Sequence, residues 1–261
     1  MAYVLGLIFG LLTLRVSLFY LNQSIGLYFD HVALTMVLGG TFAVAVISAP
    51  WHHFRELRRG LGRMIFGRHA SHTSVIEAGL RFVQDTAAVS RGAFPLSSVA
   101  GEILRDGQEL IALNFTTEDI ENILQERLYQ AIEKQRKVAD YFMSLSKYPP
   151  AFGLVGTVLG LVNLMRAITE GMDPRQTGVK MALALVATLY GLIVANLIVA
   201  PVGEAINNRV GLEQFQAEIA LQAVLLAADR VSLLKSQELL NSYVSKKQRV
   251  NIIGKLVKDA A

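Results

Sequence analysis

The amino-acid sequence predicts an all-α, polytopic membrane protein with four transmembrane helices and a helical cytoplasmic domain. Two observations predict this class. Of the 261 residues, 52% are hydrophobic and only 18% are charged, whereas soluble globular chains carry about 25% charged residues. In addition, four apolar stretches are each close to the roughly 20 residues with which a helix crosses a bilayer core. These stretches are residues 2–21, 31–50, 149–165 and 181–202.

The first apolar stretch has the position of a secretory signal, but it lacks a basic start and a small-residue cleavage site, and a second apolar stretch follows within ten residues. We therefore predict that it is retained as a span. We predict that the chain divides into four segments. Residues 1–50 contain spans one and two, and residues 51–148 form a cytoplasmic helical domain. Residues 149–202 contain spans three and four, and residues 203–261 form a cytoplasmic C-terminal helix with a basic tail.

The basic residues predict the orientation of the spans. Residues 51–148 carry thirteen of the 25 Lys and Arg residues and the tail after residue 202 carries eight, whereas residues 22–30 carry none. Because basic loops stay on the cytoplasmic side, both termini are predicted to be cytoplasmic. Five arginines follow Trp51, and we interpret them as topology signals in contact with anionic membrane lipid rather than with nucleic acid. They are Arg55, Arg58, Arg59, Arg63 and Arg68.

Helical signals mark the cytoplasmic segments. Thr116 to Asp119 fits the [ST]-x-x-[DE] pattern of a helix start, and apolar residues then recur at helical spacing up to about residue 145, which predicts one helix running straight into the third span. Gly92 and Pro95 interrupt the stretch 74–113, where we expect two or three shorter helices. After Pro201 we expect a long amphipathic stretch up to about residue 244.

The sequence offers little catalytic chemistry. Without cysteine, disulfides and thiolate metal sites are excluded. His69 and His72 have the spacing of metal ligands, but no further ligand lies near them in the sequence, and zinc needs three or four. We find no phosphate-binding loop and no nucleophile–base arrangement. We therefore predict that the protein is not an enzyme and holds no cofactor.

The third and fourth spans carry faces of small residues. Such faces let helices approach closely in lipid, where van der Waals contact and interhelical hydrogen bonds supply the association energy. We predict that both spans pack inward, against each other or against other chains. The residues concerned are Gly153, Gly156 and Gly160 in the third span, and Ala184, Gly191 and Ala195 in the fourth.

Two threonines of these spans are candidates for an ion path. At about 1.5 Å of rise per residue, Thr157 lies roughly 12 Å from one end of its span and Thr188 roughly 10 Å from the other end of its own. Their hydroxyl oxygens could line a water-filled cation path, or they could bond only to their own backbone carbonyls, as threonine commonly does in helices. The four spans contain no Asp, Glu or Lys. If the protein conducts a cation, another chain must supply the carboxylate that holds it.

These motifs resemble those of the flagellar stator subunits MotA and PomA. The resemblance rests on residues 150–161, with Pro-Ala-Phe-Gly-Leu-Val-Gly-Thr-Val-Leu-Gly-Leu, on residues 187–191 and 195–201, and on Asp30 ahead of Gly39-Gly40-Thr41. It reaches all four spans and matches their order, and the cytoplasmic segment matches weakly. The related ExbB and TolQ proteins have a single span before the cytoplasmic segment, whereas this chain has two.

The resemblance implies a homopentamer in the bacterial inner membrane that encloses two copies of a MotB-like single-span partner, whose aspartate carries the proton or sodium ion. The cytoplasmic segment would then push on the rotor protein FliG. The resemblance also implies a role for each motif residue. Thr157 and Thr188 would line the ion path, Asp30 would lie near its outer mouth, Pro150 and Pro201 would shape its cytoplasmic ends, and Arg91 would face the rotor.

The family pattern breaks after Arg91, because Leu96-Ser97-Ser98 stands where an acidic residue is usual and Glu102 is the next acid. Arg91 is equally well explained as a solvated surface charge. Two other functions stay open, an ExbB/TolQ-like energiser of an outer-membrane system and a structural scaffold that moves no ion. The hydroxyl pair slightly favours sodium, but the sequence leaves proton and sodium both possible.

Overall fold

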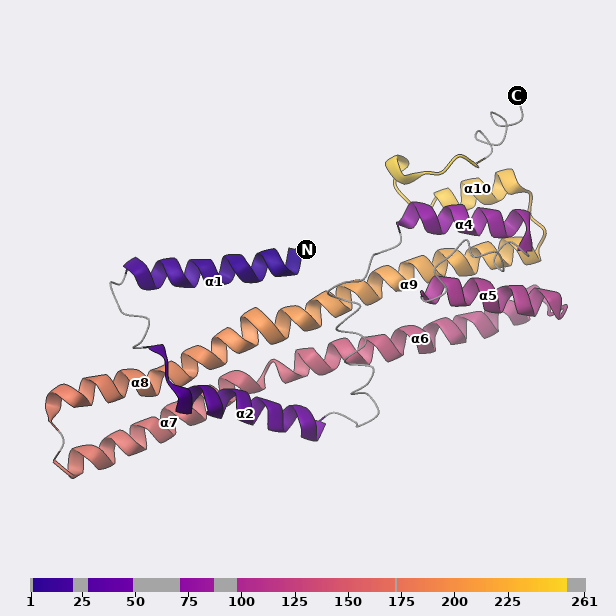
Figure 1. Ribbon diagram of the computed structural model, residues 1–261. Helices are drawn as coiled ribbons and strands as arrows, with labels where there is room; N and C mark the ends of the chain where they lie inside the picture. The colour runs from indigo at the N-terminus through magenta and orange to yellow at the C-terminus, as the bar shows by residue number, and fades with distance from the viewer. Residues whose placement is uncertain (1, 21–27, 49–70, 87–97, 172, 253–261) are drawn as a thin grey trace. The chain divides into compact units, whose positions relative to one another are not determined.

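The computed structural model describes residues 2–20, 28–48, 71–86, 98–171 and 173–252. Within these residues the regular structure is helical and no β-strand occurs (Figure 1). The predicted all-α class is confirmed. The contacts divide the chain into two units. Residues 1–66 and 137–207 form one, which we call the membrane unit, and residues 67–136 and 208–261 form the other, which we call the second unit.

The membrane unit contains the four predicted spans, each as a helix. They are α1 (Ala2–Tyr20), α2 (His31–Ser48), α7 (Tyr148–Thr169) and α8 (Pro174–Ile193). Helices α7 and α8 form a hairpin, and α2 packs across both. Among the described residues, three helices are long and apolar enough to cross a membrane, and α1 contributes a shorter apolar helix. Helices are required there because backbone groups find no water in lipid.

Helix α8 is followed without a break by further helical turns. It passes through a π-helical segment, Val194–Val199, into α9 (Ala200–Ala228). The backbone N–H of Ala200 bonds to the carbonyl of Ala195 in the wider π pattern. Pro201 follows directly, and proline inside a helix has no N–H and crowds the carbonyl four residues earlier. The wider turn before Pro201 relieves this crowding, so the chain continues as a helix past the proline.

Helix α6 (Thr117–Leu145) begins where the sequence predicts. The hydroxyl of Thr116 accepts a bond from the Asp119 backbone N–H at 3.2 Å and donates one to the Asp119 carboxylate at 2.6 Å. The expected straight run into the third span is interrupted by a turn at residues 146–147. Pro149 and Pro150 then occupy the first turn of α7, where their missing N–H groups cost no helical hydrogen bond.

The second unit packs shorter helices around α9. It contains α4 (His72–Gln84), α5 (Val99–Ala112), most of α6 and α9, and α10 (Leu233–Asn241) with a short 3-10 turn at Lys246–Gln248. The prediction of two or three short helices is confirmed by α4 and α5. A Cβ placed on Gly79 of α4 would meet Ala223 at 2.9 Å, and one on Gly107 of α5 would meet Val224 at 2.5 Å. Glycine at these two positions therefore lets α4 and α5 approach α9 closely.

The expectation of one amphipathic stretch up to residue 244 is wrong in its length. Helix α9 buries one face, on which Ala217, Ile219, Ala220, Ala223 and Val224 are all 0% exposed. The helix ends at Ala228. There the N–H of residue 230 bonds to the carbonyl of residue 227, that of residue 231 bonds to the carbonyl of residue 226, and residue 230 has a φ of 51°. This bonding pattern terminates a helix.

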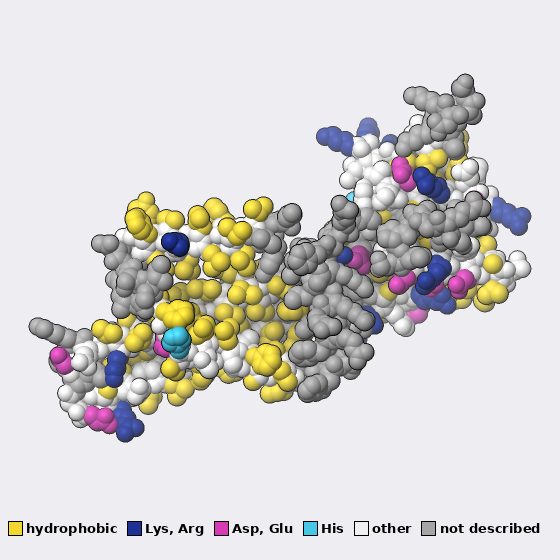
Figure 2. Space-filling view, viewed as in Figure 1, with side chains coloured by type: hydrophobic (Ala, Val, Ile, Leu, Met, Phe, Trp, Pro, Cys, Tyr) yellow, Lys and Arg dark blue, Asp and Glu magenta, His cyan; other side chains and the backbone are white. Residues whose placement is uncertain are grey.

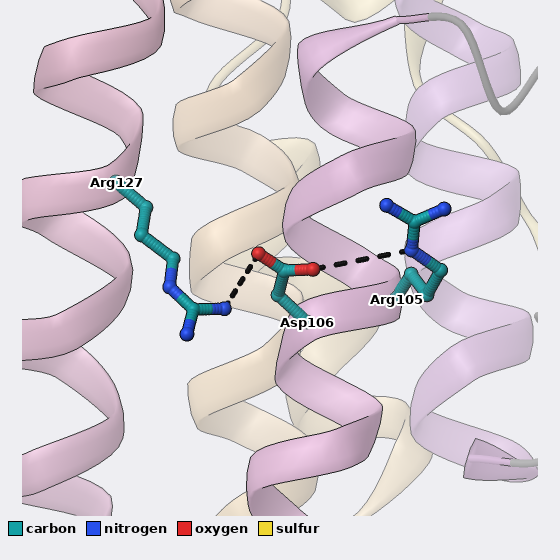
Figure 3. Close-up of polar contacts among 3 residues, drawn as sticks. All are labelled: Arg105, Asp106 and Arg127. Carbon is teal, nitrogen blue, oxygen red and sulfur yellow. Dashed lines mark hydrogen bonds and ion pairs between the residues drawn. The ribbon is translucent and has the colours of Figure 1, made fainter.

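A charged cluster joins α5 to α6 in the second unit. The carboxylate of Asp106 lies between two guanidinium groups, 2.7 Å from Arg127 and 3.9 Å from Arg105 (Figure 3). The two arginine side chains are about half exposed, at 49% and 51%, and Asp106 is 23% exposed. Water therefore screens this cluster, and it adds little to the packing energy of the unit.

Candidate functional site

The two small-residue faces of α7 and α8 pack against each other within one chain. A Cβ on Gly153 would lie 2.8 Å from the carbonyl oxygen of Ala187, and a Cβ on Gly160 would lie 2.7 Å from the Cβ of Ala184. Gly156 faces Ala187 in the same way, at 2.8 Å. The sequence left open whether these faces meet each other or other chains. The structure brings them together, and the backbones touch where a larger residue would hold the helices apart.

Pro150 and Pro201, which the resemblance places at the cytoplasmic ends of the ion path, lie in different surroundings. A Cβ on Gly191 would lie 2.5 Å from the carbonyl oxygen of Pro149 and 3.0 Å from Cα of Pro150, so the start of α7 rests directly on α8. Pro201 lies beyond the π-helical segment, which also contains the buried Ala195. The sequence reasoning missed this segment, although a proline inside a long apolar run was the available signal. A role for Pro150 and Pro201 in conformational coupling stays a prediction.

The two candidate threonines meet at this contact. Their hydroxyl oxygens lie 2.6 Å apart, and either can be the donor. Thr157 also bonds to the carbonyl of Gly153 at 3.1 Å, and Thr188 lies 3.4 Å from the same carbonyl. Three neutral oxygens from two helices thus converge on one point. The reading of Thr157 as bonded to its own backbone is confirmed, but the bond to Thr188 shows that this is not its only bond. A place for the two hydroxyls on an ion path stays a prediction.

The two threonines differ in exposure. Thr157 is 8% exposed, whereas Thr188 is half-buried. Hydroxyl oxygens are neutral ligands suited to hard cations, but such cations take six or more oxygens. The three oxygens here are too few to hold such a cation by themselves. A cation or a proton carrier that reached this point from outside the chain would meet Thr188 first, and Thr157 would hold that hydroxyl in place.

Asp30 lies apart from the threonine pair and caps α2. Its carboxylate accepts a hydrogen bond from the backbone N–H of Val32 at 2.8 Å. Its own N–H donates to the hydroxyl of Tyr190 at 3.2 Å, and that hydroxyl donates to the carbonyl of Tyr28. Tyr190 of α8 thereby fixes the start of α2. This capping role explains Asp30 structurally, and its place at the mouth of an ion path stays a prediction.

Two further predicted sites are only partly covered by the structure. Arg91 lies outside the described residues, and so does His69. Ser98, at the end of the stretch that lacks the usual acid, caps α5 by accepting a bond from the Gly101 N–H at 3.2 Å. His72 begins α4, and its ring packs edge-on against Phe215. The described residues contain no group of three or more potential metal ligands.

Comparisons with known proteins agree with this arrangement. The sequence model of the MotA/TolQ/ExbB proton channel family matches residues 96–218 of this chain. The chemotaxis protein PomA of Vibrio alginolyticus is 23% identical over 252 residues, which cover 95% of this chain and 97% of PomA. Motility protein A of Borreliella burgdorferi is 27% identical over 206 residues, 77% of each chain. Over most of its length the chain is therefore similar to the motility proteins MotA and PomA.

The fold of this chain is also shared with a solved structure. A chain of the C. jejuni MotAB structure superposes with a TM-score of 0.82 over 96% of this chain and 98% of that one, at 17% sequence identity. The protein therefore has the helical fold of that structure, and its long apolar helices are those of a membrane protein. The resemblance to the MotA and PomA proteins that was drawn from its motifs is confirmed.

Proposed function

We propose that this chain is an ion-conducting stator subunit of a bacterial flagellar motor. In this proposal five copies surround two copies of a MotB-like single-span protein in the inner membrane, with both termini of this chain in the cytoplasm. Ion flow past the threonine pair turns the ring, and the cytoplasmic segment pushes on a FliG-like rotor protein. The names of the relatives and the presence of two spans ahead of the cytoplasmic segment support this proposal.

One observation carries the ion-conducting part. The threonine hydroxyls and the Gly153 carbonyl put three oxygens at one point of the α7–α8 contact, yet the four spans contain no Asp or Glu. Ionisable groups inside a membrane are expensive and mark ion pathways. A site with neutral oxygens and no charge is therefore half of an ion site, and the carboxylate comes from the single-span partner.

The proposed roles of the two threonines follow from their exposure. Thr188 exchanges its bond to Thr157 for a bond to the passing ion or to the partner's carboxylate. Thr157 stays bonded to the Gly153 carbonyl and receives the Thr188 hydroxyl again after the ion has left. Because a hydroxyl can both donate and accept, the same pair serves a proton or a sodium ion.

The test compares three variants of Thr188 in cells whose only stator is this chain with its partner. Thr188→Ser keeps the hydroxyl, Thr188→Val keeps the shape without it, and Thr188→Ala removes both. We expect the serine variant to keep most of its torque. The valine and alanine variants should assemble in the membrane but lose most of their torque, because losing one hydrogen bond to an ion slows each ion passage by about tenfold or more. Torque is measured on tethered cells and assembly by immunoblot of membranes.

Full torque in Thr188→Val would show that the hydroxyl only packs the helices, as in the scaffold alternative. Swimming speed with and without sodium, at fixed membrane potential, then shows whether sodium or the proton is the driving ion. Speed that follows sodium identifies a sodium stator, and speed that an uncoupler abolishes in either medium identifies a proton stator.

The family model also covers TolQ and ExbB, which keeps an energiser of an outer-membrane system as the second candidate. Normal assembly with no motility in any medium would favour this second candidate.

The rotor contact is proposed for Arg91, and Arg91→Glu is expected to reduce torque without changing the amount of the protein in the membrane. Recovery of torque with a compensating charge change on the rotor protein would assign the contact.

A further inference from the structure

A groove on the membrane unit lies among α2, α7 and α8, and the threonine pair does not use it. The groove has a volume of about 760 Å³. Its lining is of two kinds. The deep part is made of small and apolar residues, among them Gly39, Gly40, Gly156 and Ala187, whereas the mouth carries the polar side chains of Asp30, His31, Asn163 and Lys180.

The groove follows the first half of α2. Helix α2 has 18 residues, so it is about 27 Å long and close to the thickness of a bilayer core. The mouth lies at its first residues and the deep end at Gly39 and Gly40, which are in the middle of the helix. There the ring of Phe152 packs directly against Gly40. A transmembrane helix of another chain would need a groove along a whole span, whereas this one follows only half of α2.

Gly39 points to an occupant from outside the chain. A Cβ placed on Gly39 meets nothing within 4 Å, so no contact within the described residues requires a glycine there. Glycine inside a helix costs about 1 kcal/mol relative to alanine. In membrane helices glycine occurs where another group must come close. Figure 2 shows hydrophobic side chains gathered on the visible face of the membrane unit, so an apolar occupant of the groove would continue this surface.

The charges at the mouth fit a zwitterionic headgroup. Within the described residues the ammonium of Lys180 makes no ion pair, either with Asp30 or with another carboxylate. One oxygen of the Asp30 carboxylate caps α2, which leaves the other lone pairs of the carboxylate available to a cation. An unpaired cation and a carboxylate at the same mouth match a phosphate and an ammonium that are joined in one molecule.

We propose that this groove binds a glycerophospholipid with an ethanolamine headgroup, with one acyl chain lying along Gly39 and Gly156, the phosphate on Lys180 and the ethanolamine ammonium on Asp30. The lipid belongs to the leaflet at the start of α2, which is the outer leaflet in the proposed topology. This binding does not depend on ion conduction. A bound lipid would cover the outer side of the contact between α2 and the α7–α8 hairpin.

Native mass spectrometry of the detergent-solubilised complex, purified with its partner chain, tests the proposal. The complex is delipidated and then exposed to phosphatidylethanolamine or to phosphatidylglycerol. We expect phosphatidylethanolamine to be retained more strongly. Gly39→Leu adds a side chain to the deep groove from a position where a Cβ meets nothing within 4 Å, and it is expected to lower the affinity for phosphatidylethanolamine by about tenfold or more. Lys180→Gln is expected to lower the affinity severalfold for both lipids.

Asp30→Asn tests the headgroup specifically, because asparagine caps a helix as well as aspartate does. This variant is expected to lose the preference for phosphatidylethanolamine over phosphatidylglycerol. The matched controls are Gly6→Leu, at a glycine of α1 that is equally open, and Arg166→Gln, at an exposed cation that is already paired with Glu170. Both controls are expected to retain lipid like the original chain.

Three results would overturn the proposal. Equal lipid retention in Gly39→Leu and the original chain would place bound lipid elsewhere. Dissociation of the Gly39→Leu complex without lipid loss would show that a protein chain occupies the groove. Stronger retention of phosphatidylglycerol by the original chain would show that Asp30 does not select the headgroup.

Discussion

The membrane unit and the second unit are both built from helices, but they bury different side chains. Most of the largest fully buried side chains belong to the second unit, among them Phe82, Ile76 and Leu124, whereas the membrane unit contributes Leu164 and Val37. The membrane unit instead leaves large apolar residues such as Phe9, Phe42 and Leu154 exposed, at 68%, 66% and 61%. Its helices meet through glycine and alanine.

The difference follows from the solvent that each unit is built for. In water, burying a large apolar side chain stabilises the fold by about 1.5–3 kcal/mol, so a core collects such residues. In lipid this gain is absent, because the acyl chains are as apolar as leucine, and close backbone approach supplies the association energy. The same substitution is therefore expected to have different effects in the two units.

The largest effect is expected for Phe82→Ala in the second unit. Phe82 is 0% exposed, and removing a buried phenylalanine ring costs about 3–5 kcal/mol. Hydrogen exchange read by mass spectrometry resolves the units. Peptides from α4, α5 and α9 are expected to lose protection, whereas peptides from α7 and α8 keep theirs.

Phe115→Ala is the control for this experiment, because Phe115 lies in the same unit but is 44% exposed. It should leave the exchange pattern nearly unchanged. If Phe82→Ala instead loosened both units equally, they would unfold as one body, and the contrast drawn between them would not extend to their stability.

A smaller effect is expected in the membrane unit for Gly153→Ala, which adds one methyl group. The new Cβ would meet backbone atoms, the Ala187 carbonyl oxygen at 2.8 Å and Cα of Thr188 at 3.0 Å, and neither can rotate away. Overpacking of this kind costs about 1–3 kcal/mol. We expect a lower melting temperature of the solubilised complex and less protein in the membrane. Gly178→Ala is the control, because a Cβ there meets nothing within 4 Å.

An unchanged melting temperature for Gly153→Ala would mean that α7 and α8 can separate without cost. The close contact would then not be what holds the membrane unit together. The comparison with Gly178 removes the general effect of replacing glycine in a helix, because alanine has the higher helix propensity at both sites.

The sequence predicted the helices of the membrane unit well, because lipid permits few other structures. Composition alone located the spans, and the hydroxyl and carboxylate of Thr116 and Asp119 marked the start of α6. The end of α9 was missed, since no glycine or proline marks it and Arg230 adopts a positive φ of 51°. Serine is a preferred residue at the start of a helix, so Ser232, which precedes α10, could have indicated that a new helix begins there.

The sequence predicted which residues form the candidate site, but not how they are arranged in space. Small faces on both spans indicated close packing, and the depths of Thr157 and Thr188 were estimated separately for each helix. Whether the two hydroxyls meet depends on the register between α7 and α8, which is set by the contacts of Gly153, Gly160 and Gly191. No pattern within one helix encodes this register. The bond between the two threonines therefore emerged only from the structure.

The smallest effect is expected for the charged cluster of α5 and α6. Asp106→Asn removes the carboxylate between Arg105 and Arg127 and leaves two like charges near each other. Because the arginine side chains are about half exposed, water screens the cluster, and the change is expected to cost under about 1 kcal/mol. The lost stability should be visible at low salt in a thermal melt of the solubilised complex.

Salt and the two arginines sharpen this last prediction. At 1 M salt the screening length falls to about 3 Å, so Asp106→Asn and the original chain should melt together there. Arg127→Gln should destabilise more than Arg105→Gln, because Arg127 lies 2.7 Å from the carboxylate and Arg105 lies 3.9 Å away. A loss as large as that of Phe82→Ala, persisting at high salt, would mean that the cluster is packed and desolvated. The second unit would then owe its stability to polar contacts as well as to its apolar core.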